Sequence, residues 1–107
     1  MAEELPIPPS VRSVQNANEL IRAWAAHGGL VCSLNPGAWP QDQAAVAWGI
    51  LLSDIARHVA DALQQTYALD KGALLSRMRA VFDAELDQPS GETKGNFVSL
   101  TLLLVWI

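Results

Sequence analysis

The stretch QDQAAVAWGILLSDIARHVADALQQTY (Gln41–Tyr67) decides the fold, because its pattern predicts one long helix. The first half, around Trp48, is apolar on nearly every face, which is typical of a helix that is covered all round. After Ser53 the pattern becomes amphipathic, and one apolar stripe continues to the end: Ile55, Val59, Ala62, Leu63 and Thr66. We therefore expect a nearly continuous helix whose first half is buried.

Two further helices are expected on either side of this stretch. One follows it, from about Asp70 to Asp87, with an apolar stripe at helical spacing: Leu74, Leu75, Met78, Val81, Phe82 and Leu86. The other precedes it. Asn16 followed by Glu19 is a variant of the capping box, and Gly28 and Gly29 are typical of the end of a helix. We expect this first helix between Asn16 and His27.

Two apolar segments favour strands. Leu30–Leu34 is short and partly β-branched, and it lies between Gly28-Gly29 and the turn-forming Asn35-Pro36-Gly37. The run Phe97–Ile107 alternates in part and has about half the length that a membrane-spanning helix needs. The expected fold is therefore α+β, with three helices packed on a small two- or three-stranded sheet. We expect one domain over residues 1–107, in which prolines make residues 1–14 an extended N-terminal arm.

Composition excludes several classes of protein. The chain has 107 residues, eleven acidic against seven basic side chains and a formal charge of −4, which argues against nucleic-acid binding as its main role. A single cysteine, Cys32, rules out an intramolecular disulfide and any zinc site with several cysteines, and it fits a reducing compartment. The first ten residues contain two acids and three prolines, unlike a signal peptide. We expect a cytoplasmic protein without a membrane role.

The best candidate for chemistry is a helix face that carries Asp54, His58 and Asp61. At i, i+4 and i+7 these side chains share one stripe, which could hold a divalent metal or pair an acid with a base. The competing interpretation is a solvated face with an Asp54–His58 pair and an Arg57–Asp61 pair beside it. Soluble helices often show such patterns, so we favour the solvated face and expect no metal, no cofactor and no catalytic residue.

Trp39 and Cys32 are weaker candidates. Trp39 lies in a rigid turn, where a side chain can contact a ligand or a partner, or fold back onto the helix that follows. We favour the second interpretation, because tryptophan is usually well buried. Cys32 could act as a nucleophile with His27 or His58 as the base, but its apolar strand is typical of a cysteine that acts as a small hydrophobic residue.

Longer segments resemble a known family. The pieces are Arg22–Trp24, His27–Leu30, Ser33–Trp39, Ala47–His58 and Arg79–Glu85. Together they resemble a family of small uncharacterised bacterial domains of unknown function. The resemblance implies a bacterial, cytoplasmic α+β protein and transfers no catalytic residue. It does not extend to Phe97–Ile107.

Two functional hypotheses remain. The first is a non-catalytic interaction or regulatory module that acts as a homodimer with an unknown protein partner. It is favoured by two apolar surfaces that one small chain would struggle to cover: Leu100–Ile107, and the ring formed by Val46, Trp48, Ile50, Leu51 and Leu52. The alternative is that the C-terminal run closes over the long helix within one chain. The second hypothesis is a small enzyme or ligand-binding protein that uses Asp54, His58 and Asp61 near Trp39.

Overall fold

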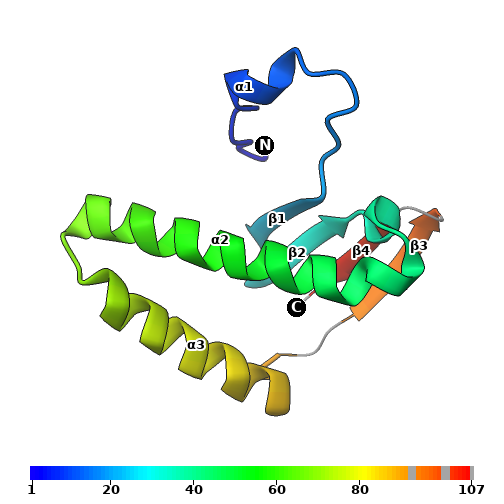
Figure 1. Ribbon diagram of the computed structural model, residues 1–107. Coiled ribbons are helices and arrows are strands. Elements are labelled where there is room, and N and C mark those ends of the chain that lie inside the picture. The colour runs from blue at the N-terminus through cyan, green and yellow to red at the C-terminus, as the bar shows by residue number, and fades with distance from the viewer. Residues whose placement is uncertain (92–93, 100–101, 107) are drawn as a thin grey trace.

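The chain folds into a four-stranded antiparallel sheet and a pair of long helices, an α+β arrangement as expected (Figure 1). The computed structural model describes residues 1–91, 94–99 and 102–106. The strands are β1 (Ile21–Ala26), β2 (Gly29–Leu34), β3 (Lys94–Ser99) and β4 (Leu102–Trp106), in the order β1-β2-β4-β3. The sheet has more strands than the two or three expected, because residues 21–26 join it and the C-terminal run contributes two strands.

The helix expected between Asn16 and His27 is wrong, because Ile21–Ala26 forms strand β1. Asn16 does not cap a helix and has a left-handed backbone, with φ of 66°. The glycines that were interpreted as a helix end belong to a hairpin. Ala26 pairs with Gly29, so the loop has two residues, His27 and Gly28, and both have positive φ. This is the requirement of a tight hairpin turn whose twist matches that of the strands.

The second strand confirms the sequence interpretation of residues 30–34. β2 pairs with β1 on one side, where Cys32 lies opposite Ala23, and with β4 on the other, where Cys32 lies opposite Val105. The C-terminal run also forms strands, as expected. Residues 100, 101 and 107 of that run lie outside the described residues, and so does the expectation that its side chains leave an apolar surface.

The two long helices confirm their predictions. α2 spans Ala44–Tyr67 and α3 spans Lys71–Asp87, joined by a short turn in which Ala68 adopts a left-handed backbone, with φ of 56°. The Asp70 carboxylate accepts a hydrogen bond of 2.8 Å from the backbone N–H of Ala73 and so caps α3. A single 3-10 turn, Gln41–Gln43, leads into α2, and another, Pro36–Ala38, follows β2.

The N-terminal arm contains one helical turn, α1 (Pro9–Arg12), which starts with proline at its first position. Proline suits this position because its missing N–H has no partner in a first turn. The remainder of residues 1–20 is largely irregular and extended, and almost all of it is exposed.

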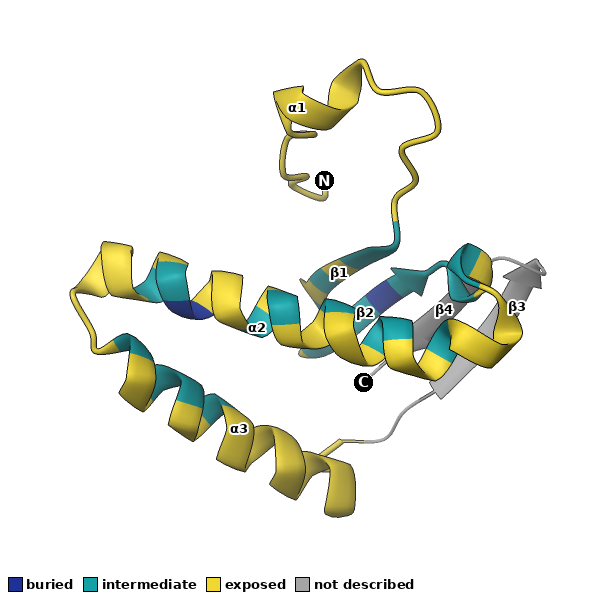
Figure 2. Ribbon diagram, viewed as in Figure 1, coloured by how far each residue is buried: buried dark blue, intermediate teal, exposed yellow. Residues whose placement is uncertain are grey.

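The first half of α2 is not buried, contrary to expectation. Val46 is 68% exposed and Ile50 is 56% exposed (Figure 2). The sheet covers only one side of this helix, so apolar side chains on the other sides face solvent. Among residues 1–91, only Cys32 and Ala60 are buried. This part of the chain therefore has a very small interior of its own.

Candidate interaction surface

The acidic and histidine side chains on α2 do not converge on a metal or on each other. Asp54 pairs with Arg57 on the same helix, and Asp61 pairs with Lys71 of α3, with Oδ1 2.6 Å from Nζ. These partners differ from the Asp54–His58 and Arg57–Asp61 pairs expected from spacing alone. No group of three His, Cys, Asp or Glu side chains in the described part of the chain is placed to hold a metal ion. The face behaves as a solvated ridge with two ion pairs.

Trp39 folds back onto the start of α2. Its ring meets that of Trp48 at a centroid distance of 5.6 Å and an interplanar angle of 86°, an edge-to-face contact. Trp48 and His58 lie ten residues apart on one helix, about 15 Å along its axis. The structure therefore brings Trp39 together with Trp48, and it does not bring Trp39 to the ridge of Asp54, His58 and Asp61.

Cys32 lies in the middle of β2 and is buried. Burial raises the pKa of its thiol, because the thiolate loses solvation in an apolar environment. A raised pKa lowers the fraction of thiolate at neutral pH, whereas nucleophilic cysteines need the opposite shift. The position supports the interpretation of Cys32 as a small hydrophobic residue.

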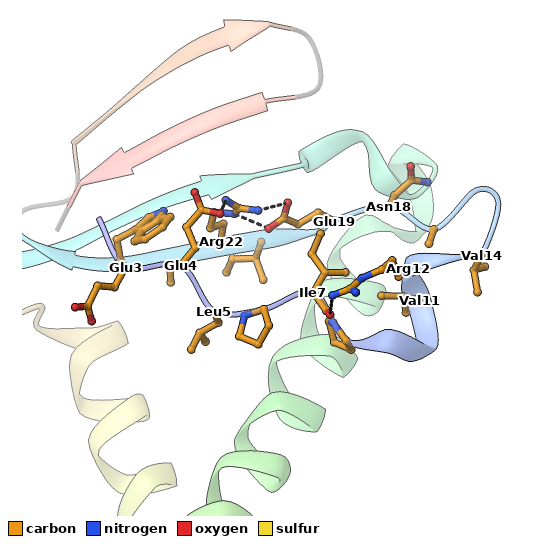
Figure 3. Close-up of a pocket in the computed structure, with 16 residues that line it drawn as sticks. Glu3, Glu4, Leu5, Ile7, Val11, Arg12, Val14, Asn18, Glu19 and Arg22 are labelled. Carbon is orange, nitrogen blue, oxygen red and sulfur yellow. Dashed lines mark hydrogen bonds and ion pairs between the residues drawn. The ribbon is translucent and has the colours of Figure 1, made fainter. Parts of the chain in front are cut away.

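A cavity of about 580 Å³ lies between the N-terminal arm and β1 (Figure 3). Arg22 forms ion pairs on the charged side of this cavity. The guanidinium contacts Glu19 at 2.7 Å and Glu4 of the arm at 3.5 Å. Its hydrogen bonds lower the pKa of the Glu19 carboxyl group and raise the pKa of Arg22 itself. Arg22, Glu4 and Glu19 are thus paired with one another, and the cavity is not lined by Trp39, Asp54, His58 or Asp61.

A more distinctive feature is an apolar stripe along α2 that faces solvent. Leu52, Ile55 and Val59 are 41%, 37% and 41% exposed, and they follow one another at intervals of three and four residues. Ala62 and Thr66 continue the same interval and are also exposed. We call these five residues the overhang stripe. The sequence contained this signal as an amphipathic pattern after Ser53, but the pattern alone did not show that the chain leaves the stripe uncovered.

A second exposed apolar set lies on α3. Leu74, Leu75 and Met78, in the first half of α3, are half-buried near α2, whose Ala60 is fully buried. The same helical stripe continues with Val81, Phe82 and Leu86, and these three are exposed. The two helices diverge from their connecting turn, so the second half of α3 loses the cover that α2 gives to the first half (Figure 1).

The overall dimensions agree with an incompletely covered chain. The accessible surface is 8893 Å², whereas a compact monomer of this mass exposes about 5,800 Å². The Cα radius of gyration is 15.5 Å, whereas about 13 Å is expected of a compact domain of this length. The extended arm and the exposed faces of α2 and α3 both contribute to this excess.

Comparison with known proteins identifies the family. The model of a domain of unknown function, DUF5076, matches residues 4–90. The chain belongs to the DUF5076 family. The matched residues include the arm, the β1–β2 hairpin, the overhang stripe and all of α3, whereas β3 and β4 lie beyond the match. The family description assigns no activity to any of these elements.

A solved structure is similar to this DUF5076 chain over nearly its whole length. It is described as a "putative pyruvate dehydrogenase from the photosynthetic bacterium Rhodopseudomonas palustrus CGA009". The two chains are 29% identical, the TM-score is 0.72, and the similarity covers 92% of this chain and 98% of the other. No curated protein matches the chain. None of the helices in the described residues is long and apolar enough to cross a bilayer.

Proposed function

We propose that this DUF5076 chain is a small non-catalytic interaction or regulatory module that acts as a homodimer. The observation that carries the proposal is the exposed overhang stripe on α2, in a chain whose residues 1–91 bury only Cys32 and Ala60. An apolar surface of this kind on a soluble protein is typical of a surface that binds another chain.

The area involved matches what a second copy would cover. The chain exposes about 3,000 Å² more than a compact monomer of its mass. Obligate homodimers bury about 2,000–5,000 Å² in total, half from each partner. A second copy would therefore cover about 1,000–2,500 Å² of each chain, and the extended arm accounts for part of the remaining excess. Two-fold dimers are also the commonest soluble oligomers, so a second copy is a simpler occupant than an unrelated protein.

Charge supports the same occupant. The chain carries a net charge of −4, so two copies repel one another at long range, and a contact surface that carries charges of its own could add to this repulsion. The overhang stripe contains no ionisable side chain, so contact along it adds no like-charge pair to the long-range repulsion of the two chains. The nearby charges Asp54 and Asp61 are each paired, with Arg57 and with Lys71. Two copies can therefore meet on this face without bringing unpaired carboxylates together.

The proposed setting is the bacterial cytoplasm, without a nucleic-acid or membrane partner. The single buried cysteine supports a reducing compartment, and the similar solved structure comes from a bacterium. The net negative charge argues against a phosphate-rich partner.

An enzymatic role is the competing proposal, and the description of the similar structure names an enzyme. In this chain the candidate side chains do not meet around a cavity: Asp54 and Asp61 pair with neighbouring cations, and Trp39 packs on Trp48. We therefore carry no catalytic residue and no substrate over to this chain.

Sedimentation equilibrium at micromolar concentrations tests the homodimer. The wild type should have twice the 11.5 kDa mass of one chain. Ile55→Glu places a charge in the overhang stripe and should shift the mass toward one chain, whereas Gln64→Glu, on the opposite side of α2, should leave the dimer intact. Circular dichroism of both variants separates dissociation from unfolding. A wild-type mass of one chain at every concentration would refute the homodimer.

A further inference from the structure

The spacing of the overhang stripe indicates how a second copy would approach. Leu52, Ile55, Val59, Ala62 and Thr66 follow the alternating three- and four-residue interval of a coiled-coil seam. Trp48 stands one interval before Leu52, but it is half-buried and packs on Trp39. The seam that remains open therefore begins at Leu52 and ends at Thr66.

The position of the sheet explains why this seam is open. Residues 44–51 of α2 lie over the sheet, and there Ala44, Ala47, Trp48 and Leu51 are half-buried (Figure 2). Residues 52–67 extend past the sheet toward the turn into α3 (Figure 1). α3 packs beside Ala60, which lies on a different side of α2 from the overhang stripe. Neither the sheet nor α3 covers the stripe.

We infer, on the basis of the proposed homodimer, that the α2 helices of two copies pair antiparallel along the overhang stripe, with the two-fold axis at Val59. A two-fold contact places the same surface on both copies. Antiparallel pairing puts each sheet at the opposite end of the contact and sets the two helix dipoles in opposition. Parallel pairing would bring both sheets to the same end of the seam, where the two sheets would clash.

The register follows from the sizes of the side chains. With the axis at Val59, this residue meets Val59 of the partner subunit. Ile55 meets Ala62 of the partner subunit, and Leu52 meets Thr66 of the partner subunit. Each large side chain therefore lies opposite a small one, so the layers have similar volume along the whole contact. A register centred on Ile55 would instead place Leu52 opposite Val59 and leave Ala62 and Thr66 beyond the seam.

Disulfide trapping tests direction and register. In a Cys32→Ala background, Val59→Cys should form a linked dimer under mild oxidation, and Gln64→Cys, on the opposite side of α2, should not. Leu52→Cys and Thr66→Cys should each stay unlinked alone and link when mixed, because each cysteine then has a partner within disulfide reach. The readout is the doubled mass on a non-reducing gel, with circular dichroism as the folding control.

The outcomes separate this inference from the proposed homodimer. A disulfide between two copies of the Leu52→Cys variant would show parallel pairing and overturn the inference. A sedimentation mass of two chains without a Val59→Cys link would place the dimer contact elsewhere, which also overturns the inference but keeps the homodimer. A mass of one chain would refute both.

Discussion

Residues 44–51 and residues 52–67 of α2 form one continuous helix, yet only the first segment has the sheet beneath it (Figure 1). In the first segment the edge of Trp48 meets Trp39, and that side of the helix is half-buried. In the second segment the corresponding side carries the overhang stripe, which is exposed. One apolar side continues from Trp48 through Leu52 into the overhang stripe, so the difference in exposure along that side comes from what packs against each segment.

The comparison shows where the stability of a single chain resides. The first segment is held by an aromatic contact, and the second is held by α3, at the fully buried Ala60. The remaining apolar surface of α2 contributes to stability only when something covers it. We call these two contacts the anchors of the segments. A substitution at either anchor should destabilise one segment of α2 more than the other.

The largest effect is expected at Ala60, the anchor of the second segment. Ala60→Leu adds three heavy atoms at the fully buried position of α2, and it should lower the free energy of unfolding by about 1–3 kcal/mol. Urea unfolding at one fixed protein concentration measures the change. Ala80→Leu is the matched control, because Ala80 is exposed on α3 and lies outside the overhang stripe, so the same enlargement there should cost far less. Equal losses in both variants would contradict the assigned packing.

The anchor of the first segment should give a smaller, specific effect. A double-mutant cycle with Trp39→Ala and Trp48→Ala should show a coupling of about 0.5–1.5 kcal/mol from the edge-to-face contact. Urea unfolding of the wild type, both single variants and the double variant supplies the four values. If the two single losses simply add, the rings do not interact in solution.

Loss of the N-terminal cap of α3 should change the free energy of unfolding by about as much as the Trp39–Trp48 coupling, or by less. Asp70→Ala removes the acceptor of the Ala73 N–H and should cost about 1 kcal/mol in the free energy of unfolding. Asp70→Asn keeps an acceptor oxygen and should recover most of the loss, as measured in the same urea experiment. If the asparagine variant is as unstable as the alanine variant, the cap does not account for the effect.

Sequence patterns predicted the two long helices and β2, because periodicity over many residues and clear turn residues reflect local physics. They failed at Ile21–Ala26, where a capping-box variant suggested a helix. The residues that decide this region are His27 and Gly28 between two apolar segments, because a two-residue hairpin turn requires positive φ and both residues adopt it. Burial of α2 was mispredicted because the position of the sheet is a tertiary property that no local pattern contains.

The candidate site was predictable only in part. Spacing placed Asp54, His58 and Asp61 on one face correctly, but the partners of both carboxylates were misassigned, since Lys71 reaches Asp61 from another helix. The fold-back of Trp39 followed from its burial tendency and is confirmed by the contact with Trp48. The overhang stripe was visible as a pattern, whereas its exposure depends on how far α2 extends past the sheet.

Small-angle X-ray scattering tests most directly whether one chain is half of an assembly, because it reports mass and size together. We expect a mass of twice 11.5 kDa and a radius of gyration above the 15.5 Å of one chain. A mass of one chain at every concentration would contradict it. A radius near 13 Å at that mass would show further that the chain closes over its own helix.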